Sequence, residues 1–121
     1  LIQNGLLLKA ANAPAVYILQ NGIRQLLSYF VFTQRGLDRE QIATVSQDEL
    51  TRFAVSTWLY PPAENTLIRG DQLPTVYVIE GGRRRGLNLA AFQARGYQFA
   101  QVKTLAQSEV NGYEQGADIV Q

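Results

Sequence analysis

The sequence predicts an α+β fold built from two tandem repeats of about 60 residues that share one core. The first observation is internal similarity, because residues 7–60 match residues 67–120 without a gap. The second is that each copy contains two strand-like runs joined by a two-residue turn, which is typical of a β-hairpin. The third is that helix-capping residues follow each hairpin, so short helices should accompany the strands.

The two copies occupy residues 1–60 and 61–121, and a proline-led loop at residues 60–65 joins them. A unit of this size buries little surface alone, so we expect the copies to pack together as one compact unit. The apolar pair Leu1 and Ile2 resembles the tail at residues 119–120. This similarity predicts that the N-terminus carries the last strand of a preceding unit or closes onto this chain's own C-terminus.

Three strands are predicted in each copy, at equivalent positions. They cover residues 6–9, 15–20 and 23–27 in the first copy, and residues 67–69, 75–80 and 83–87 in the second. β-Branched and aromatic residues dominate the middle strand of each set, as is typical of strands. The turns Asn21-Gly22 and Gly81-Gly82 consist of residues that adopt a positive φ at low cost, which predicts type I′ hairpins.

A short helix is predicted directly after each hairpin. Ser28 and Asn88 are suited to its N-cap, because their side-chain oxygens can accept a hydrogen bond from a free backbone N–H. Gly36 and Gly96 are suited to the left-handed position that follows its last turn. These residues therefore predict where each helix begins and ends.

An extended segment and a second short helix complete each copy. The extended segments lie at residues 42–45 and 102–105. In the first copy, Ser46 and Glu49 form a capping-box pattern at the start of the second helix. In the second copy Ala106 replaces the serine, so this helix start should be less well determined.

Residue types absent from the chain exclude several classes of chemistry. With no His and no Cys, the chain cannot form a Ser–His or Cys–His nucleophile pair, a disulfide or a thiolate metal site. A net charge of +1 provides no global field for nucleic acid. The longest apolar run, residues 26–32, is too short to span a bilayer. We therefore expect no enzyme activity, cofactor, metal site, nucleic-acid partner or membrane span.

A longer motif recurs in both copies. The second copy reads VYVIEGGRRR at residues 76–85, then Ala91-Phe92, then GYQF at residues 96–99. The first copy carries VYILQNGIR at residues 16–24, then Val31-Phe32 and Gly36. This pattern resembles a tandem repeat of bacterial secreted and cell-surface proteins. The resemblance implies a secreted or envelope-associated module that often lies beside enzymes and brings no catalytic residues of its own.

The chain departs from this resemblance at two places. The first copy has Leu37 and Arg39 where the repeat would have aromatic residues. Both copies also lack the proline usually found after the hairpin. The departures predict that the repeat is adapted to one particular setting.

Arg24 and Arg84 recur at one position of the repeat, diagonal to Tyr17 and Tyr77 across the hairpin. One interpretation is that each guanidinium packs over a tyrosine ring. Another is that these residues form a contact surface for a protein partner. A third is that both tyrosines lie exposed on one face and stack on sugars, as in a carbohydrate- or cell-wall-binding module.

Arg83, Arg84 and Arg85 form the densest charge cluster of the chain. Guanidinium groups hold phosphate, sulfate or carboxylate, which makes Arg83 and Arg85 candidates for an anion site. However, Glu80 is expected to face Arg83 across the hairpin and to pair with it. Alternation along the strand also places Arg84 on the opposite face. A solvated hairpin is therefore the competing interpretation.

Trp58 and Tyr60 interrupt the internal similarity, since Trp58 aligns with Asp118. Tryptophan and tyrosine are enriched at interaction hot spots, so this aromatic cluster is a candidate contact site. A tryptophan that fills the junction between the copies would explain it equally well.

Duplicated units usually serve by stacking, spacing or presenting a surface. Together with the resemblance, this predicts a non-enzymatic interaction or accessory module of the bacterial cell envelope or extracellular space. Its partner would be a protein or larger assembly, with cell-wall polysaccharide as the alternative. The candidate contact residues are Trp58, Tyr60, Arg24, Arg84, Tyr17 and Tyr77. Since the chain does not begin with Met, we expect a processed protein or a fragment.

Overall fold

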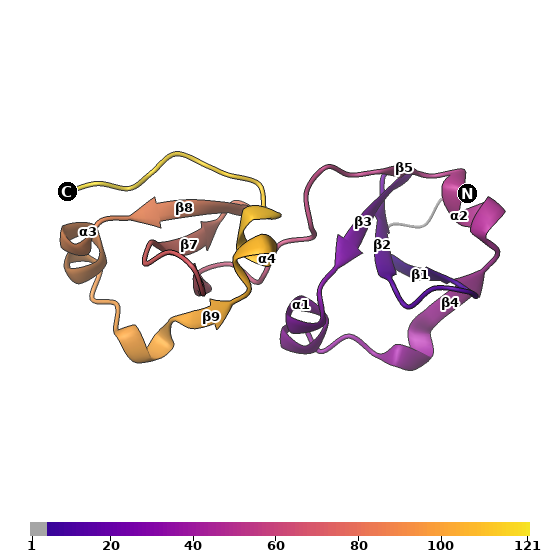
Figure 1. Ribbon diagram of the computed structural model, residues 1–121, viewed down its shortest axis with the longest axis horizontal. Coiled ribbons are helices and arrows are strands. Elements are labelled where there is room, and N and C mark those ends of the chain that lie inside the picture. Colours follow the sequence, from indigo (N-terminus) through magenta and orange to yellow (C-terminus); the bar gives the residue numbers. More distant parts are fainter. Residues whose placement is uncertain (1–4) are drawn as a thin grey trace. The chain divides into compact units, whose positions relative to one another are not determined.

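The computed structural model describes residues 5–121 and divides the chain between Tyr60 and Pro61 into two compact units, unit 1 and unit 2 (Figure 1). Each unit is a small β-sheet accompanied by two short helices and a 3₁₀ turn. The predicted α+β class with two similar sheet units is therefore confirmed. A core shared by the two copies stays a prediction, and the strand predicted at Leu1 and Ile2 lies outside the described residues.

Unit 1 is a five-stranded sheet in the order β4-β1-β2-β3-β5. Its elements are β1 (Leu6–Ala10), β2 (Val16–Gln20), β3 (Ile23–Leu27), α1 (Tyr29–Gln34), the 3₁₀ turn η1 (Arg39–Gln41), β4 (Ile42–Val45), α2 (Gln47–Thr51) and β5 (Ala54–Val55). The first three strands are antiparallel, whereas β4 runs parallel to β1 and β5 runs parallel to β3. The sequence did not predict β5.

Unit 2 is a four-stranded sheet in the order β8-β7-β6-β9. Its elements are β6 (Leu67–Gly70), β7 (Val76–Glu80), β8 (Arg83–Leu87), α3 (Leu89–Ala94), the 3₁₀ turn η2 (Phe99–Gln101), β9 (Lys103–Leu105) and α4 (Gln107–Asn111). Where unit 1 has β5, unit 2 has only isolated bridges, from Arg84 to Gln115 and from Leu87 to Ile119. The same arrangement of elements therefore occurs twice along the chain.

The hairpin turns and the first helix of each unit form where the sequence predicts them. Asn21 and Gly22 both have positive φ, at 52° and 78°. Ser28 Oγ accepts from the Val31 N–H at 3.1 Å, and Asn88 Oδ1 accepts from the Ala91 N–H at 2.8 Å. Residues 36 and 96, the two glycines after these helices, also have positive φ. These predictions succeed because each depends on groups only a few residues apart.

The second helices begin in different ways. In unit 1, Ser46 and Glu49 form the predicted capping box. In unit 2, Ala106 makes no side-chain cap, and Asp71 Oδ1 instead accepts from the Gln107 N–H at 3.0 Å. A carboxylate from a distant part of the sequence thus replaces the missing serine cap. The residues close to Ala106 gave no sign of this contact.

The tails of the two units differ in length by one residue, so the gapless match of the copies breaks between Ser56 and Tyr60. The N–H groups of Ser56 and Gly116 donate to the equivalent carbonyls of Arg24 and Arg84, each at 2.9 Å. Further on, the Tyr60 N–H donates to the carbonyl of Leu26 at 2.9 Å. In unit 2 the equivalent carbonyl, that of residue 86, accepts from the N–H of residue 119. Three residues, 57–59, therefore stand where unit 2 has two, and the predicted gapless match of Tyr60 with residue 120 is wrong.

In each unit a helix packs on the sheet and contributes to a buried cluster. In unit 1, α2 contributes Leu50 to a buried cluster with Leu8, Ala10 and Leu19. In unit 2, Ala91 and Phe92 of α3 pack in a buried cluster with Leu67, Val76, Val78 and Leu87. Each of these clusters consists of residues from one unit. Within residues 5–121, no helix has both the length and the apolar character needed to cross a membrane.

Candidate functional site: a groove in each unit

A row of four side chains crosses the sheet of unit 1 from β4 to β3. Lys9 pairs with Thr44 on one side and with Val16 on the other, and Val16 pairs with Leu27. Side chains of directly paired residues point to the same face of a sheet. Thr44, Lys9, Val16 and Leu27 therefore share one face of the sheet.

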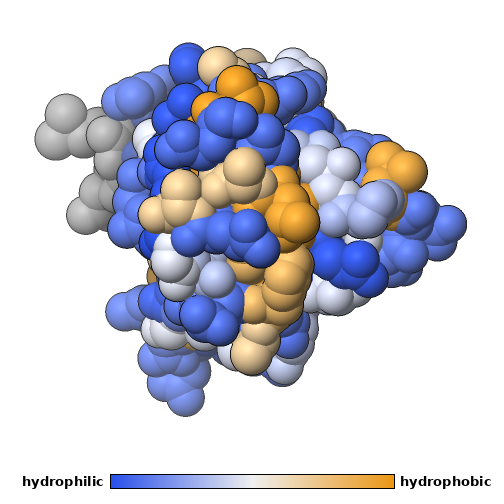
Figure 2. All heavy atoms as spheres, turned by 90° about the vertical axis from the view of Figure 1, so that its left-hand side faces the viewer, coloured by the Kyte–Doolittle hydropathy of each residue, from blue (hydrophilic) through white to orange (hydrophobic). Residues whose placement is uncertain are grey.

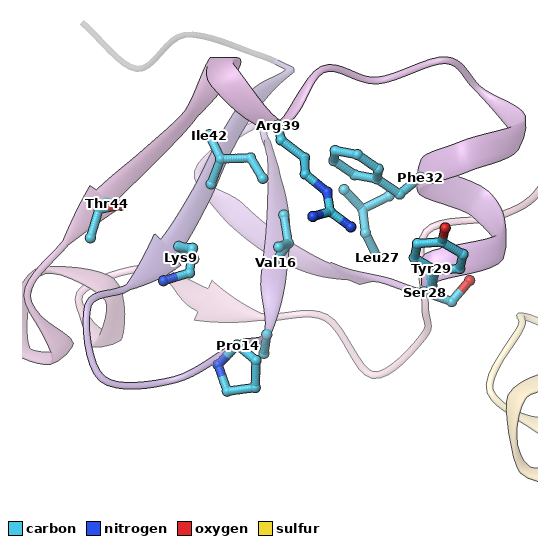
Figure 3. Close-up of a pocket in the computed structure, with 11 residues that line it drawn as sticks. Lys9, Pro14, Val16, Leu27, Ser28, Tyr29, Phe32, Arg39, Ile42 and Thr44 are labelled. Carbon is cyan, nitrogen blue, oxygen red and sulfur yellow. The ribbon is translucent and has the colours of Figure 1, made fainter.

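Two short elements cover part of this row and leave a groove, which we call groove 1. Tyr29 and Phe32 reach it from α1, Arg39 from η1, and Ile42 from the start of β4, and the hollow measures about 560 Å³. Figure 3 shows the Arg39 side chain pointing into the groove near Phe32, with Lys9 across Val16 from Leu27. The groove combines an apolar floor with two cationic side chains.

The same row occurs in unit 2. Arg69 pairs with Thr104 and Val76, and Val76 pairs with Leu87. A hollow of about 280 Å³, groove 2, lies over it and is lined by Pro74, Thr75, Val76, Leu87, Asn88, Leu89, Phe92 and Phe99. Each of these positions is the equivalent, 60 residues later, of a residue that lines groove 1. The two grooves are therefore the same feature of the repeat.

One substitution accounts for much of the difference between the grooves. Phe99 of unit 2 stacks on Phe92, with ring centroids 4.5 Å apart and an angle of 21° between the rings. The equivalent of Phe99 in unit 1 is Arg39. An aromatic ring thus fills space in groove 2 where a flexible cation lies in groove 1. The sequence carried this signal, because Arg39 departs from the aromatic residue of the repeat.

The two grooves also differ in charge. Lys9 and Arg39 both line groove 1, whereas the residues that line groove 2 include no charged side chain. Among residues 5–121, no carboxylate forms an ion pair with Lys9 or Arg39. Lys9 Nζ donates to the Ala10 carbonyl at 3.1 Å. Groove 1 therefore carries two positive charges that this part of the chain does not neutralise.

Exposed apolar side chains accompany groove 2. Leu89 is 58% exposed and Phe99 is 65% exposed, although both are large apolar residues. Figure 2 looks onto the side of unit 2 that carries α3 and shows apolar groups gathered in a band among polar ones. In unit 1, Tyr29 occupies the position of Leu89 and is 74% exposed. Exposed apolar groups around a concave surface are typical of interaction sites.

The recurring arginines and tyrosines pack together in both units, as one of the interpretations predicted. The guanidinium carbon of Arg24 lies 4.7 Å from the centre of the Tyr17 ring, and that of Arg84 lies 5.0 Å from Tyr77. Each Nε also donates to a backbone carbonyl. Arg24 Nε donates to the carbonyl of Phe53 at 3.1 Å, and Arg84 Nε donates to the carbonyl of the equivalent residue, Tyr113, at 3.0 Å.

This arrangement reduces the surface that the arginine–tyrosine pairs offer a partner, most of all in unit 2. Arg84 is only 8% exposed, and each tyrosine ring has one side covered by a guanidinium. Sugars bind aromatic rings through an open face. The carbohydrate alternative stays a prediction, but its structural argument is weaker.

Arg83 and Arg85 lie on one side of β8 with their charges already paired, while Arg84 lies on the other. Arg83 Nε donates to Glu114 at 2.9 Å, and Arg85 Nη1 donates to Glu80 at 2.8 Å. The predicted pairing of Glu80 with Arg83 is therefore wrong, although the two residues are opposite in register. The tail of unit 2 runs beside β8 and brings Glu114 to Arg83. This pairing argues against an anion site at Arg83 and Arg85.

Trp58 and Tyr60 lie in the tail of unit 1. Trp58 is 37% exposed, and its backbone N–H donates to Ser56 Oγ at 3.2 Å. The guanidinium carbon of Arg35, at the end of α1, lies 4.7 Å from the centre of the Tyr60 ring. Trp58 therefore keeps accessible surface, and its role as a contact residue stays a prediction. Neither residue lines groove 1.

Glu80 is bound by two arginines on the α3 side of unit 2. It accepts from Arg95 and from Arg85, each at 2.8 Å. The hydrogen bond from Arg95 is the largest influence on the Glu80 carboxyl and lowers its pKa; partial burial opposes this, but the hydrogen bond from Arg85 and the charges of both arginines keep the pKa below its usual value. The residue at the equivalent position of unit 1 is Gln20.

We expect Glu80→Gln to make the stability of the protein less sensitive to acid. A carboxyl with a lowered folded-state pKa stabilises the fold above its unfolded pKa, and this contribution is lost as the pH falls through the folded value. Denaturant unfolding followed across the acidic range should therefore show a difference between wild type and variant that shrinks as the pH falls. Gln20→Ala serves as the neutral control at the equivalent position, and a constant difference for Glu80→Gln would contradict this assignment.

Comparison of the chain with known proteins adds no further constraint on the site. No family model, curated protein or solved structure matches it. Within the part of the chain that the structure describes, no group of three or more His, Cys, Asp or Glu side chains is placed to hold a metal ion. The candidate site therefore depends on the geometry of the two grooves.

Proposed function

We propose that the chain is a non-enzymatic interaction module that binds a partner protein, with the two equivalent grooves receiving side chains of the partner. The observation that carries the proposal is the same concave apolar surface at the same place in both units. Sites that bind ligands are typically concave and mostly apolar, with a few polar groups. The resemblance of the repeat adds a location in the bacterial cell envelope or extracellular space.

The residues that line the grooves favour binding over catalysis. Neither lining contains a carboxylate, and the chain has no His or Cys. The Ser28 hydroxyl in groove 1 caps α1. The Lys9 amine, which lines groove 1 opposite Thr44, donates to the Ala10 carbonyl, so it is not engaged as the base beside a nucleophile that most covalent mechanisms need.

Site-specific photo-cross-linking tests the proposal. A benzophenone amino acid is placed at Tyr29 of groove 1 or at Leu89 of groove 2, and the protein is irradiated in an envelope fraction. We expect both positions to cross-link to the same partner protein, identified by mass spectrometry. Thr51 in α2 is an exposed control position outside the grooves. Equal cross-linking from Thr51, or none from the grooves, would count against the proposal.

A titration with the purified partner completes the test. Because the Tyr29 side chain is largely exposed, Tyr29→Ala should leave the fold intact while weakening binding about tenfold, as expected of an aromatic contact residue. The variant Trp58→Ala tests, in the same assay, the contact site that the sequence predicts in the tail of unit 1. Loss of binding in Trp58→Ala alone would assign the contact to the tail of unit 1 and refute docking in the grooves.

A further inference from the structure

The charge of groove 1 narrows the chemistry of its occupant. We infer that groove 1 binds an acidic peptide segment, with its carboxylates held by Lys9 and Arg39 and a neighbouring apolar side chain on the groove floor. This inference rests on the proposed function, because it assigns the kind of partner segment that the groove accepts. It concerns unit 1 alone, since groove 2 lacks both cations.

The first argument is charge complementarity. Lys9 and Arg39 both line the groove, and among residues 5–121 neither of them has a carboxylate partner. A guanidinium and a carboxylate form strong, directional hydrogen bonds, and an ammonium adds a compact positive charge. Two cations that line one hollow therefore favour anionic groups over neutral ones.

The second argument is the apolar floor between the cations. Val16 and Leu27 come from the sheet and Phe32 from α1, and all three line the groove with Arg39 (Figure 3). Apolar walls exclude water, so an ion pair formed beside them is stronger than one on an open surface. Nucleic acid would meet only two cations here, far fewer than the phosphate contacts that typically hold it. A peptide that carries both acidic and apolar side chains matches both features.

The third argument comes from the comparison of the two units. Groove 2 is built on the same row of residues, yet Phe99 replaces Arg39 and stacks on Phe92. The cation at the position of Lys9 is Arg69, whose Nε donates to Thr104 Oγ1 at 3.4 Å, and Arg69 does not line groove 2. Acid recognition thus depends on features present in one copy only.

The inference is tested with the peptide acetyl-Leu-Asp-Phe-Glu-Leu-amide and its Asn/Gln counterpart, which differs only in lacking the carboxylates. Each is titrated into the ¹⁵N-labelled full chain and followed by NMR. We expect the acidic peptide to shift backbone amide signals around Lys9, Val16 and Arg39 in a saturable manner. The neutral peptide should bind about fivefold more weakly, because charge-assisted hydrogen bonds are lost.

Two substitutions exchange the distinguishing residue between the units. Arg39→Phe should abolish the preference for the acidic peptide in groove 1, while Phe99→Arg should introduce such a preference in groove 2. Both positions are exposed, so the fold should tolerate the changes. Arg52→Ala removes an exposed cation of unit 1 that does not line the groove, and it should leave the preference unchanged.

The outcomes separate this inference from the proposed function. Equal binding of the acidic and neutral peptides in groove 1 would overturn the role of charge and leave groove docking intact. The third probe is 3-phenylpropionate, a small apolar acid. If it shifts the signals of groove 1 and the acidic peptide does not, the groove binds small apolar acids and the assignment to a peptide is wrong. Absence of shifts in groove 1 with all three probes would overturn the inference, while photo-cross-linking decides the proposed function independently.

Discussion

Phe92→Ala is expected to lower the free energy of unfolding of unit 2 by about 3–5 kcal/mol, the usual cost of truncating a buried phenylalanine. Phe92 is 3% exposed and belongs to the buried cluster of unit 2. Its ring contacts Tyr97 edge-on at 5.8 Å and stacks on Phe99 at 4.5 Å. Removing it therefore leaves a cavity and breaks two aromatic contacts at once.

The measurement is denaturant unfolding followed by two signals. Far-UV circular dichroism follows both units, whereas the fluorescence of Trp58, the one tryptophan of the chain, reports on unit 1. Phe32→Ala is the matched control, because Phe32 occupies the same position on α1 but is only partly buried. It should cost about 1–2 kcal/mol. Equal losses for the two variants would contradict the difference in packing between grooves 1 and 2.

Arg84→Ala is expected to destabilise unit 2 by about 2–4 kcal/mol, because a buried acceptor loses its donor and a cation–π contact is lost. The Arg84 side chain is buried, stacks over Tyr77 and donates from Nε to the Tyr113 carbonyl at 3.0 Å. This bond joins β8 to the segment after α4. Its loss should therefore loosen the tail of unit 2 as well as the sheet.

Hydrogen exchange measured by NMR checks this expectation. Exchange should accelerate at the N–H groups of Arg84 and Gly116, which bond between β8 and the tail. Arg24→Ala is the matched variant in unit 1, and it should cost about 1 kcal/mol because Arg24 is less buried, so that solvent screens its contact with Tyr17 more strongly. If Arg84→Ala left stability unchanged but abolished partner binding, Arg84 would be a contact residue and the structural assignment would fail.

Local signals predicted most of the regular elements. The Asn21-Gly22 turn, the Ser28 and Asn88 caps and the Ser46 capping box form as expected. Each depends on the conformational preference of one residue or on a hydrogen bond that spans three positions. Such signals are independent of how distant segments pack, and this is why the sequence alone was sufficient for them.

Contacts between distant segments account for the predictions that failed. Strand β5 exists because residues 54–55 pair with Ile23 and Arg24, and Glu114 reaches Arg83 because the tail of unit 2 runs beside β8. Short-range patterns do not report which segment lies at the edge of a sheet. The extra residue in the tail of unit 1 was hidden for the same reason.

The candidate site shows the same division. The repeat, the strands and helices of each copy and the departure at Arg39 are all readable in the chain, since they depend on residue type and on spacing. The grooves cannot be predicted in this way, because Lys9, Val16 and Arg39 come from three different elements. They line one hollow only because the register of the sheet places Lys9 beside Val16 and because η1 lies over this row. Arg39 is therefore a candidate anion-binding residue only in the folded protein, since long-range strand pairing is what brings these side chains to one hollow.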